Sequence, residues 1–136
     1  AWAAGFIDGE GCVSITKSGR KGQPLPYYRI DLLVHNTSKE PLDRLASLFG
    51  GRVVVVRPQR ARRKTTYGWK TTGTAHTARV LKDLLPWLTV KREQAVVAIE
   101  TAALFGTINR QNKAPDRARL EEAKQRMHVL NARGAA

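Results

Sequence analysis

The chain has 136 residues, and we expect residues 1–136 to form a single domain with a buried core. Twenty-four lysines and arginines against eleven acids give a net charge of +13, which favours a polyanionic partner, first of all DNA or RNA. An anionic membrane surface is the second choice, because no long basic amphipathic helix stands out. No apolar run approaches the ~18 residues of a membrane span. Cys12 is the only cysteine, which excludes an intrachain disulfide and predicts a reducing, intracellular location in the cytoplasm, the nucleoid or an organelle matrix.

Small and apolar residues open the chain and lead into alternating glycines and acids, Asp8-Gly9-Glu10-Gly11. This pattern predicts a helix over residues 1–9 that ends at its glycines, because glycine costs about 1 kcal/mol in a helix interior and readily adopts the left-handed conformation. Glu10 is then expected just beyond the helix C-terminus, where the helix dipole does not stabilise negative charge. A lone acid in that place gains from a neighbouring cation such as a metal ion.

Periodicity and turn residues define the other elements. We expect strands at 12–17, 27–35, 52–57 and 66–72, and helices at 39–49, 75–85, 90–105 and 116–131. Asn36, Thr37 or Ser38 can cap the helix at 39–49. The strands are grouped away from a helical tail, which predicts an α+β fold rather than βαβ units.

Alternation along the strands divides core side chains from an outer face. Val13, Ile15, Tyr67 and Trp69 are expected to point inward, and Val55 should share a face with Arg57. The outer face is polar and basic, which suits base edges in a major groove, while the basic loops suit phosphates. The predicted DNA-binding residues are Ser14, Thr16, Ser18, Arg20, Lys21, Arg29, Asp31, Arg57, Arg60, Arg62, Arg63, Lys64, Thr66, Lys70 and Thr72. The alternative is an ordinary solvated surface.

Residues 3–11 resemble the LAGLIDADG motif of homing endonucleases in its L-A-G-F-I-D-G-E-G form. Ala3 replaces the first leucine, and Glu10 fills the position of the metal-binding acid. The resemblance implies an αββαββα core, in which a four-stranded curved antiparallel sheet binds DNA, with extra helices at the C-terminus. It also implies that Glu10 and the carbonyl of Gly9 bind Mg²⁺. Mn²⁺ is expected to substitute, and Ca²⁺ to support binding without cleavage.

A second resemblance lies at residues 85–94, which are similar to the Leu-x-x-Lys-x-x-Gln segment of the same family. Its lysine belongs to the active-site solvent network and corresponds to Lys91, with Gln94 three residues later; the alternative is an exposed lysine in a first helical turn. The family also uses polar residues between the second strand and the second helix. The candidates in this stretch are His35, Asn36, Ser38 and Lys39, although Asn36 and Ser38 can also be plain helix caps.

The motif occurs once, whereas a double-strand cut needs an acid for each strand. In the family, single-motif proteins are homodimers, so the resemblance implies two copies of the first helix packed side by side. The expected interface residues are Ala1, Ala4, Gly5 and Asp8. A symmetric dimer predicts a symmetric DNA site.

The resemblance therefore implies a site-specific endonuclease of intron homing. It would make a staggered double-strand cut with 3′ overhangs at a long near-palindromic target, by metal-dependent phosphodiester hydrolysis. Glu10 and Lys91 are the expected catalytic residues. The alternative is a catalytically silent nucleic-acid binder of the same fold, either an intron RNA maturase or a transcription regulator. A basic RNA-binding or ribosomal protein is a third interpretation, but it does not explain residues 6–11.

Overall fold

The computed structural model describes residues 1–18, 27–57, 64–107 and 114–134. Its elements in chain order are α1 (Trp2–Glu10), β1 (Gly11–Ser18), β2 (Tyr27–Asn36), α2 (Glu40–Phe49), β3 (Arg52–Arg57), β4 (Thr66–Lys70), α3 (Thr74–Leu84), the 3-10 turn η1 (Leu85–Trp87), α4 (Arg92–Thr107) and α5 (Ala114–Gly134). The strands form one antiparallel sheet in the order β1-β2-β4-β3. The predicted α+β fold is confirmed. Within the described ranges, no helix has both the length and the apolar character needed to cross a bilayer.

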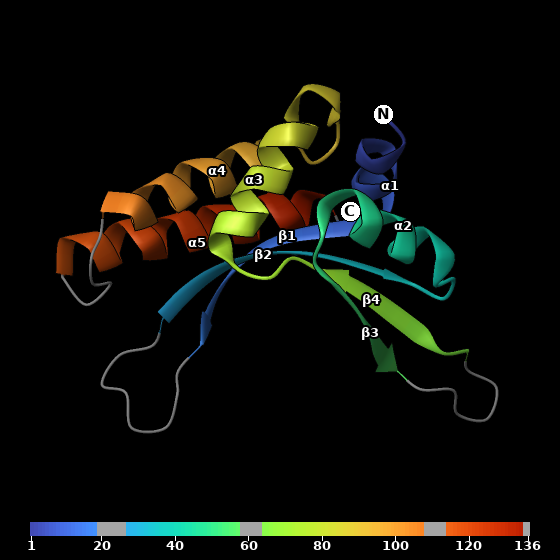
Figure 1. Cartoon of the computed structure of the whole chain (residues 1–136). Helices are drawn as coiled ribbons and strands as arrows, with labels where there is room; N and C mark the ends of the chain where they lie inside the picture. Colours follow the sequence, from blue (N-terminus) through green and yellow to red (C-terminus); the bar gives the residue numbers. More distant parts are fainter. Residues whose placement is uncertain (19–26, 58–63, 108–113, 135–136) are drawn as a thin grey trace.

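The sheet is an arch with the helices on one side only (Figure 1). In that view β1 and β2 slope down to the left and β3 and β4 to the right, while the described helices lie above the arch. Helices α4 and α5 contact β1, α3 contacts β2, and α2 contacts β4. The concave face of the sheet therefore carries no described helix and is open to a ligand.

The core lies between the sheet and the helices. Ile30, Leu32 and Trp69 from the sheet have no exposed surface, and neither do Leu81 of α3 and Leu120 of α5. Each side chain of this size contributes about 1.5–3 kcal/mol when it is fully buried. The predicted inward orientation of Trp69 is confirmed, and the burial of alternate strand residues fixes which face of the sheet is left for function.

The end of α1 differs from the prediction in one respect. The helix continues through Gly9 to Glu10, so Glu10 is its last residue and does not lie beyond it. Gly11 has extended backbone (φ −83°, ψ 161°) rather than a left-handed conformation. Close packing against Ile7 favours glycine at position 11, since a Cβ there would lie 2.8 Å from the carbonyl oxygen of Ile7 and 2.9 Å from its Cγ2. The chain thus turns directly from the helix that carries Glu10 into β1.

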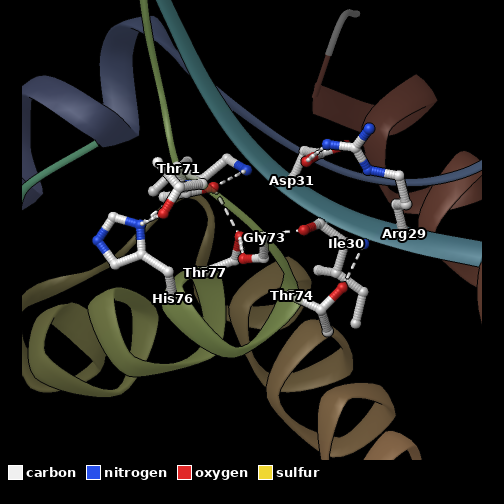
Figure 2. Close-up of polar contacts among 10 residues, drawn as sticks. Arg29, Ile30, Asp31, Thr71, Gly73, Thr74, His76 and Thr77 are labelled. Atoms are coloured by element: carbon white, nitrogen blue, oxygen red, sulfur yellow. Dashed lines mark hydrogen bonds and ion pairs between the residues drawn. The ribbon is translucent and has the colours of Figure 1, made fainter. Parts of the chain in front are cut away.

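Threonine hydroxyls complete the edge of β2 beyond the end of β4 (Figure 2). The amide of Leu32 donates to Oγ1 of Thr71 at 3.2 Å, and the amide of Ile30 donates to Oγ1 of Thr74 at 3.3 Å. The hydroxyl of Thr77 donates to the carbonyl oxygen of Ile30 at 3.0 Å. These side chains satisfy backbone groups that a longer β4 would have paired. The predicted strand at 66–72 therefore ends at Lys70.

The start of α2 also differs from the prediction. Its N-cap is Lys39, with no hydrogen bond from a capping side chain. Oδ1 of Asn36 instead accepts a hydrogen bond from the amide of Ser38 at 2.8 Å. This bond closes a turn before the helix, which is a common use of asparagine. The expected side-chain cap at 36–38 is thus replaced by a turn.

Candidate nucleic-acid interface and metal site

The strand register gathers the predicted polar residues on the concave face of the sheet. Ser14 lies opposite Asp31, Thr16 lies opposite Arg29, and Lys70 lies opposite Leu33. Paired residues of neighbouring strands point to the same face. The strand residues brought together there are Ser14, Thr16, Arg29, Asp31, Arg57, Thr66 and Lys70.

Positive charge exceeds negative charge on the described part of this face. Among the described strand residues it carries Arg29, Arg57 and Lys70, and the one acid there is Asp31. That acid pairs with Arg29 at 3.4 Å, and the Arg29 side chain remains 54% exposed (Figure 2). A concave, positively charged surface with polar side chains raises the local concentration of a polyanion.

A bulge in β3 changes which residues share this face. Val55 lies opposite Tyr67, but Arg57 lies opposite Thr66, so one extra residue separates the two pairs. Val55 and Arg57 therefore point to opposite faces, and the expectation that they share a face was wrong. Since Arg57 pairs with Thr66, it stays on the concave side.

Arg52 also lies on this face, although the sequence analysis did not include it among the DNA-binding residues. It is exposed and lies opposite Lys70 at the other end of β3. Because five residues separate Arg52 from Arg57, simple alternation places the two on opposite faces. The bulge returns them to the same one, and no signal in the sequence marks it.

His35, a candidate for the solvent network, lies within β2 as the predicted strand at 27–35 requires, opposite Gly68. It is exposed, and a Cβ on Gly68 would approach within 3.1 Å of its Cδ2 and within 2.8 Å of Cγ2 of Val56. The absence of a side chain at Gly68 therefore makes room for His35 and Val56 on the concave face.

Not every predicted DNA-binding residue takes a place on the strands. Thr72 lies after the end of β4, and its hydroxyl is 3.2 Å from Nδ1 of His76, so it belongs to the turn before α3. Ser18 ends β1, and Lys64 is exposed just before β4. The loop residues Arg20, Lys21, Arg60, Arg62 and Arg63 lie outside the described residues.

Glu10 is exposed at the C-terminal end of α1 and forms no hydrogen bond or ion pair with the residues that the structure describes. Gly9 is exposed beside it. Nowhere in the described ranges do three or more His, Cys, Asp or Glu side chains gather to hold a metal ion. A carboxylate and a carbonyl are the hard oxygen donors that suit Mg²⁺, which commonly takes one or two carboxylates together with substrate phosphates. The donors present therefore fit a magnesium ion that completes its shell with other ligands.

Lys91 is held against the end of α1. Its Nζ donates to the main-chain oxygen of Asp8 at 2.9 Å, and its amide donates to Oδ1 of Asp8 at 3.0 Å. The amide of Thr89 donates to Oδ2 of Asp8 at 2.8 Å. The ammonium group thus lies next to the peptide that precedes Gly9 and Glu10, so the structure brings the two predicted catalytic residues into one neighbourhood.

Two predicted site residues are buried elsewhere. Ala4 has no exposed surface and packs into the core of its own chain, so its side chain is not available to a second subunit. Gln94 is also buried, and its Nε2 donates to the carbonyl oxygen of Leu130 on α5 at 3.5 Å. Gln94 therefore joins α4 to α5 and is removed from any solvent network.

The remaining predicted residues stay near the surface. Ala1 and Gly5 are exposed on α1, while Asn36, Ser38 and Lys39 form the turn before α2. Lys39 also pairs with Asp43 at 3.6 Å. The structure thus leaves Ala1 and Gly5 accessible, and it gives Asn36 and Lys39 local structural contacts.

Residues 3–94 match the family model described as LAGLIDADG endonuclease. The fold is similar to the homing endonuclease I-CvuI in complex with the I-CreI target, with a TM-score of 0.79 and 22% identity over 95% of this chain and 79% of that one. It is also similar to the archaeal intron-encoded homing endonuclease I-Vdi141I complexed with DNA, with a TM-score of 0.77 and 16% identity over 95% and 81% of the two chains.

The homing endonuclease I-TnaI gives a TM-score of 0.72 and 16% identity over 98% of this chain and 95% of that one. No curated protein matches the chain. At these identities the similar structures establish a shared fold.

Proposed function

Since the chain belongs to the LAGLIDADG endonuclease family, we propose that it is a site-specific DNA endonuclease. It cuts both strands of a long near-palindromic target and leaves 3′ overhangs, by hydrolysis of one phosphodiester in each strand. The observation that carries this proposal is the exposed carboxylate of Glu10, which has no partner among the described residues and ends the motif helix. A surface acid next to a strongly basic sheet is suited to bind a metal ion that also contacts a phosphate.

The concave face of the sheet is the proposed DNA-binding surface. Ser14, Thr16 and Arg29 offer donors and acceptors that match base edges in a major groove. Arg52 and Arg57 add charge on the β3 side. Contacts from such arginines neutralise phosphates, so the affinity for DNA falls steeply as the salt concentration rises. Two solved structures with a similar fold contain DNA, which supports the same use of the arch here.

Glu10 and the carbonyl of Gly9 are the proposed metal ligands, and Mg²⁺ is the proposed ion. Bound there, the ion would lower the pKa of a coordinated water and neutralise charge on the phosphate. Structures of I-CvuI in complex with DNA were solved in the presence of Mg or Ca, which is consistent with the use of a divalent ion. Mn²⁺ should replace Mg²⁺, and Ca²⁺ should support binding without cleavage. Lys91 is the proposed second catalytic residue, because its ammonium group is bound to the main-chain oxygen of Asp8, two residues before Glu10.

A homodimer supplies the second acid that a double-strand cut requires. The surface of α1 available to a second copy carries Ala1, Gly5 and Gly9, which are spaced four residues apart and exposed. A Cβ built on Gly5 or on Gly9 meets nothing within 4 Å, so packing within this chain does not require glycine at either position. Small residues at this spacing permit close approach of two helices. This surface replaces the predicted one that included Ala4.

A cleavage selection tests the proposal. Purified protein is incubated with a genomic or randomised duplex library and Mg²⁺, and the new ends are sequenced. We expect one near-palindromic site of about 20 base pairs with 3′ overhangs, and its symmetry would support the dimer. Salt-sensitive binding of DNA or intron RNA without new ends, in Mg²⁺ and in Mn²⁺, would overturn the nuclease and favour a silent maturase or regulator.

A further inference from the structure

The motif contains two acids, and the structure gives them different environments. Glu10 is exposed, whereas Asp8 is half-buried, and both oxygens of its carboxylate accept backbone hydrogen bonds. The donors are the amides of Thr89 and Lys91, which lie 81 and 83 residues away along the chain. A carboxylate engaged in this way belongs to the structure of a turn, and Glu10 is left as the motif acid that is accessible to a ligand.

The turn that Asp8 binds leads directly into α4. The amide of Ala95 donates to the carbonyl oxygen of Lys91 at 3.0 Å, so Lys91 stands at the N-cap of that helix. The free amides at a helix N-terminus carry partial positive charge, which favours a carboxylate beside them. Asp8 thus binds the amide of the N-cap residue Lys91 and the amide of Thr89 two residues before it, and it does so from the end of another helix.

Lys91 is attached to Asp8 at two points. Its amide is bound to the carboxylate and its ammonium group to the main-chain oxygen of the same residue, at 3.0 and 2.9 Å. A lysine side chain is long and flexible, and a single bond at its tip does not determine where its backbone lies. Anchoring the backbone as well restricts the positions that the ammonium group can reach.

We propose that Asp8 is a positioning residue, which fixes the Lys91 ammonium group beside the Asp8–Gly9 peptide by docking the start of α4 onto the end of α1. The proposal rests on the proposed function, in which Lys91 takes part in cleavage. Asp8 binds neither the metal ion nor the DNA in this account. Its effect on the reaction passes through Lys91, and placing a reactive group correctly is worth large factors in rate.

A double-mutant cycle tests whether Asp8 acts through Lys91. Single-turnover cleavage in Mg²⁺ and DNA affinity in Ca²⁺ are measured for wild type, Asp8→Asn, Lys91→Ala and the double variant. Asp8→Asn should lower the cleavage rate about 10- to 100-fold, as the loss of a supporting hydrogen-bond partner does at other sites, with DNA affinity changed less than twofold. In the Lys91→Ala background, Asp8→Asn should produce no further loss. Two losses that multiply would overturn the proposal.

Asp83→Asn is the matched control, because it removes the same charge from an exposed position on α3. It should cleave at the wild-type rate. Thermal unfolding of each variant separates loss of positioning from loss of the fold, and Asp8→Asn retains the volume and one acceptor oxygen of the native side chain. An equal loss of activity in Asp83→Asn would also count against the proposal.

A second measurement does not depend on cleavage. The lysines are dimethylated with ¹³C-formaldehyde and a borohydride, and the Lys91 resonance is assigned by its loss in Lys91→Arg. It should lie apart from the resonance of an exposed lysine such as Lys82, and Asp8→Asn should shift it toward that position. An unmoved resonance would overturn the positioning role. If wild type does not cleave any DNA, the proposed nuclease fails, while this shift still decides what Asp8 does.

Discussion

The carboxylate of Glu121 on α5 accepts a hydrogen bond from the hydroxyl of Tyr28 on β2, across the interface between the helices and the sheet. Nζ of Lys17 on β1 lies 3.0 Å from the same carboxylate. The hydrogen bond from Tyr28, followed by that from Lys17, lowers the pKa of Glu121 from its usual value of 4.5 to about 2. This contact ties the longest helix of the described residues to the convex face of the arch.

The first prediction concerns acid stability. Because the folded-state pKa of Glu121 is lowered, its ionised form favours the native state at every pH above about 4.5, and that contribution is lost as the pH falls toward 2. Glu121→Gln should be less stable than wild type at pH 7, and the difference should shrink steadily between pH 4.5 and pH 2. Urea unfolding at several pH values measures it. A difference in unfolding free energy that stays constant over this pH range would contradict the lowered pKa of Glu121.

The second prediction concerns the glycine after the motif acid. Gly11→Ala places a Cβ 2.8 Å from the carbonyl oxygen of Ile7, which forces α1 and β1 apart. Overpacking of this kind costs about 1–3 kcal/mol of unfolding free energy, and the end of α1 that carries Glu10 should move with it. Chemical denaturation and the cleavage rate should both report the change.

Gly9→Ala is its control, because a Cβ on Gly9 meets nothing within 4 Å. Alanine is favoured over glycine inside a helix by roughly 1 kcal/mol, so the folded chain should not lose stability. If Gly11→Ala proves as stable as Gly9→Ala, the close approach of Gly11 to Ile7 does not constrain the helix end.

The third prediction concerns association. Gly5 is exposed and a Cβ there meets nothing, so Gly5→Leu should leave the fold of a single chain intact while preventing close packing of two α1 helices. Sedimentation velocity should show a monomer in place of a dimer, and double-strand cleavage should be lost. Ala118→Leu adds similar bulk at an exposed site on α5 and should remain dimeric. Unchanged sedimentation of Gly5→Leu would exclude this interface.

The fourth prediction concerns the concave face. Arg52→Ala removes a positive charge beside Lys70, whereas Arg79→Ala removes one from the helical side of the molecule. Arg52→Ala should weaken DNA binding in Ca²⁺ several-fold, and loss of one phosphate contact should reduce the slope of log K against log salt by about 0.9. Arg79→Ala should change neither quantity. Equal effects of the two variants would mean that DNA does not occupy the arch.

The sequence predicted the parts of the molecule that local patterns determine. Alternation placed Trp69 inside and Thr16 outside, and glycines marked the region where α1 ends. Alternation of hydrophobic residues predicts side-chain orientation well over such short stretches, because burial of one face determines the orientation of a whole strand. The resemblance of the motif and of the Leu-x-x-Lys-x-x-Gln segment led to Glu10 and Lys91 as catalytic residues, and this assignment stays a prediction.

Contacts between segments far apart in the chain could not be predicted from the sequence. The β3 bulge that puts Arg52 on the concave face depends on pairing with β4, and the capping of α4 by Asp8 joins residues more than 80 positions apart. The exposed side of α1 was also misplaced, since Ala4 is buried in the core whereas its neighbour Gly5 is exposed. A rotation of about 100° per residue is resolved only once the helix is docked on its own core.

The most direct test of the account is Glu10→Gln. Cleavage of the selected site in Mg²⁺ and binding of the same duplex in Ca²⁺ are compared for wild type, Glu10→Gln and Glu122→Gln, the last of which alters an exposed acid on α5. Glu10→Gln should bind like wild type but should not cut, while Glu122→Gln should do both. Cleavage by Glu10→Gln at the wild-type rate would contradict the assignment of Glu10 as the metal-binding acid.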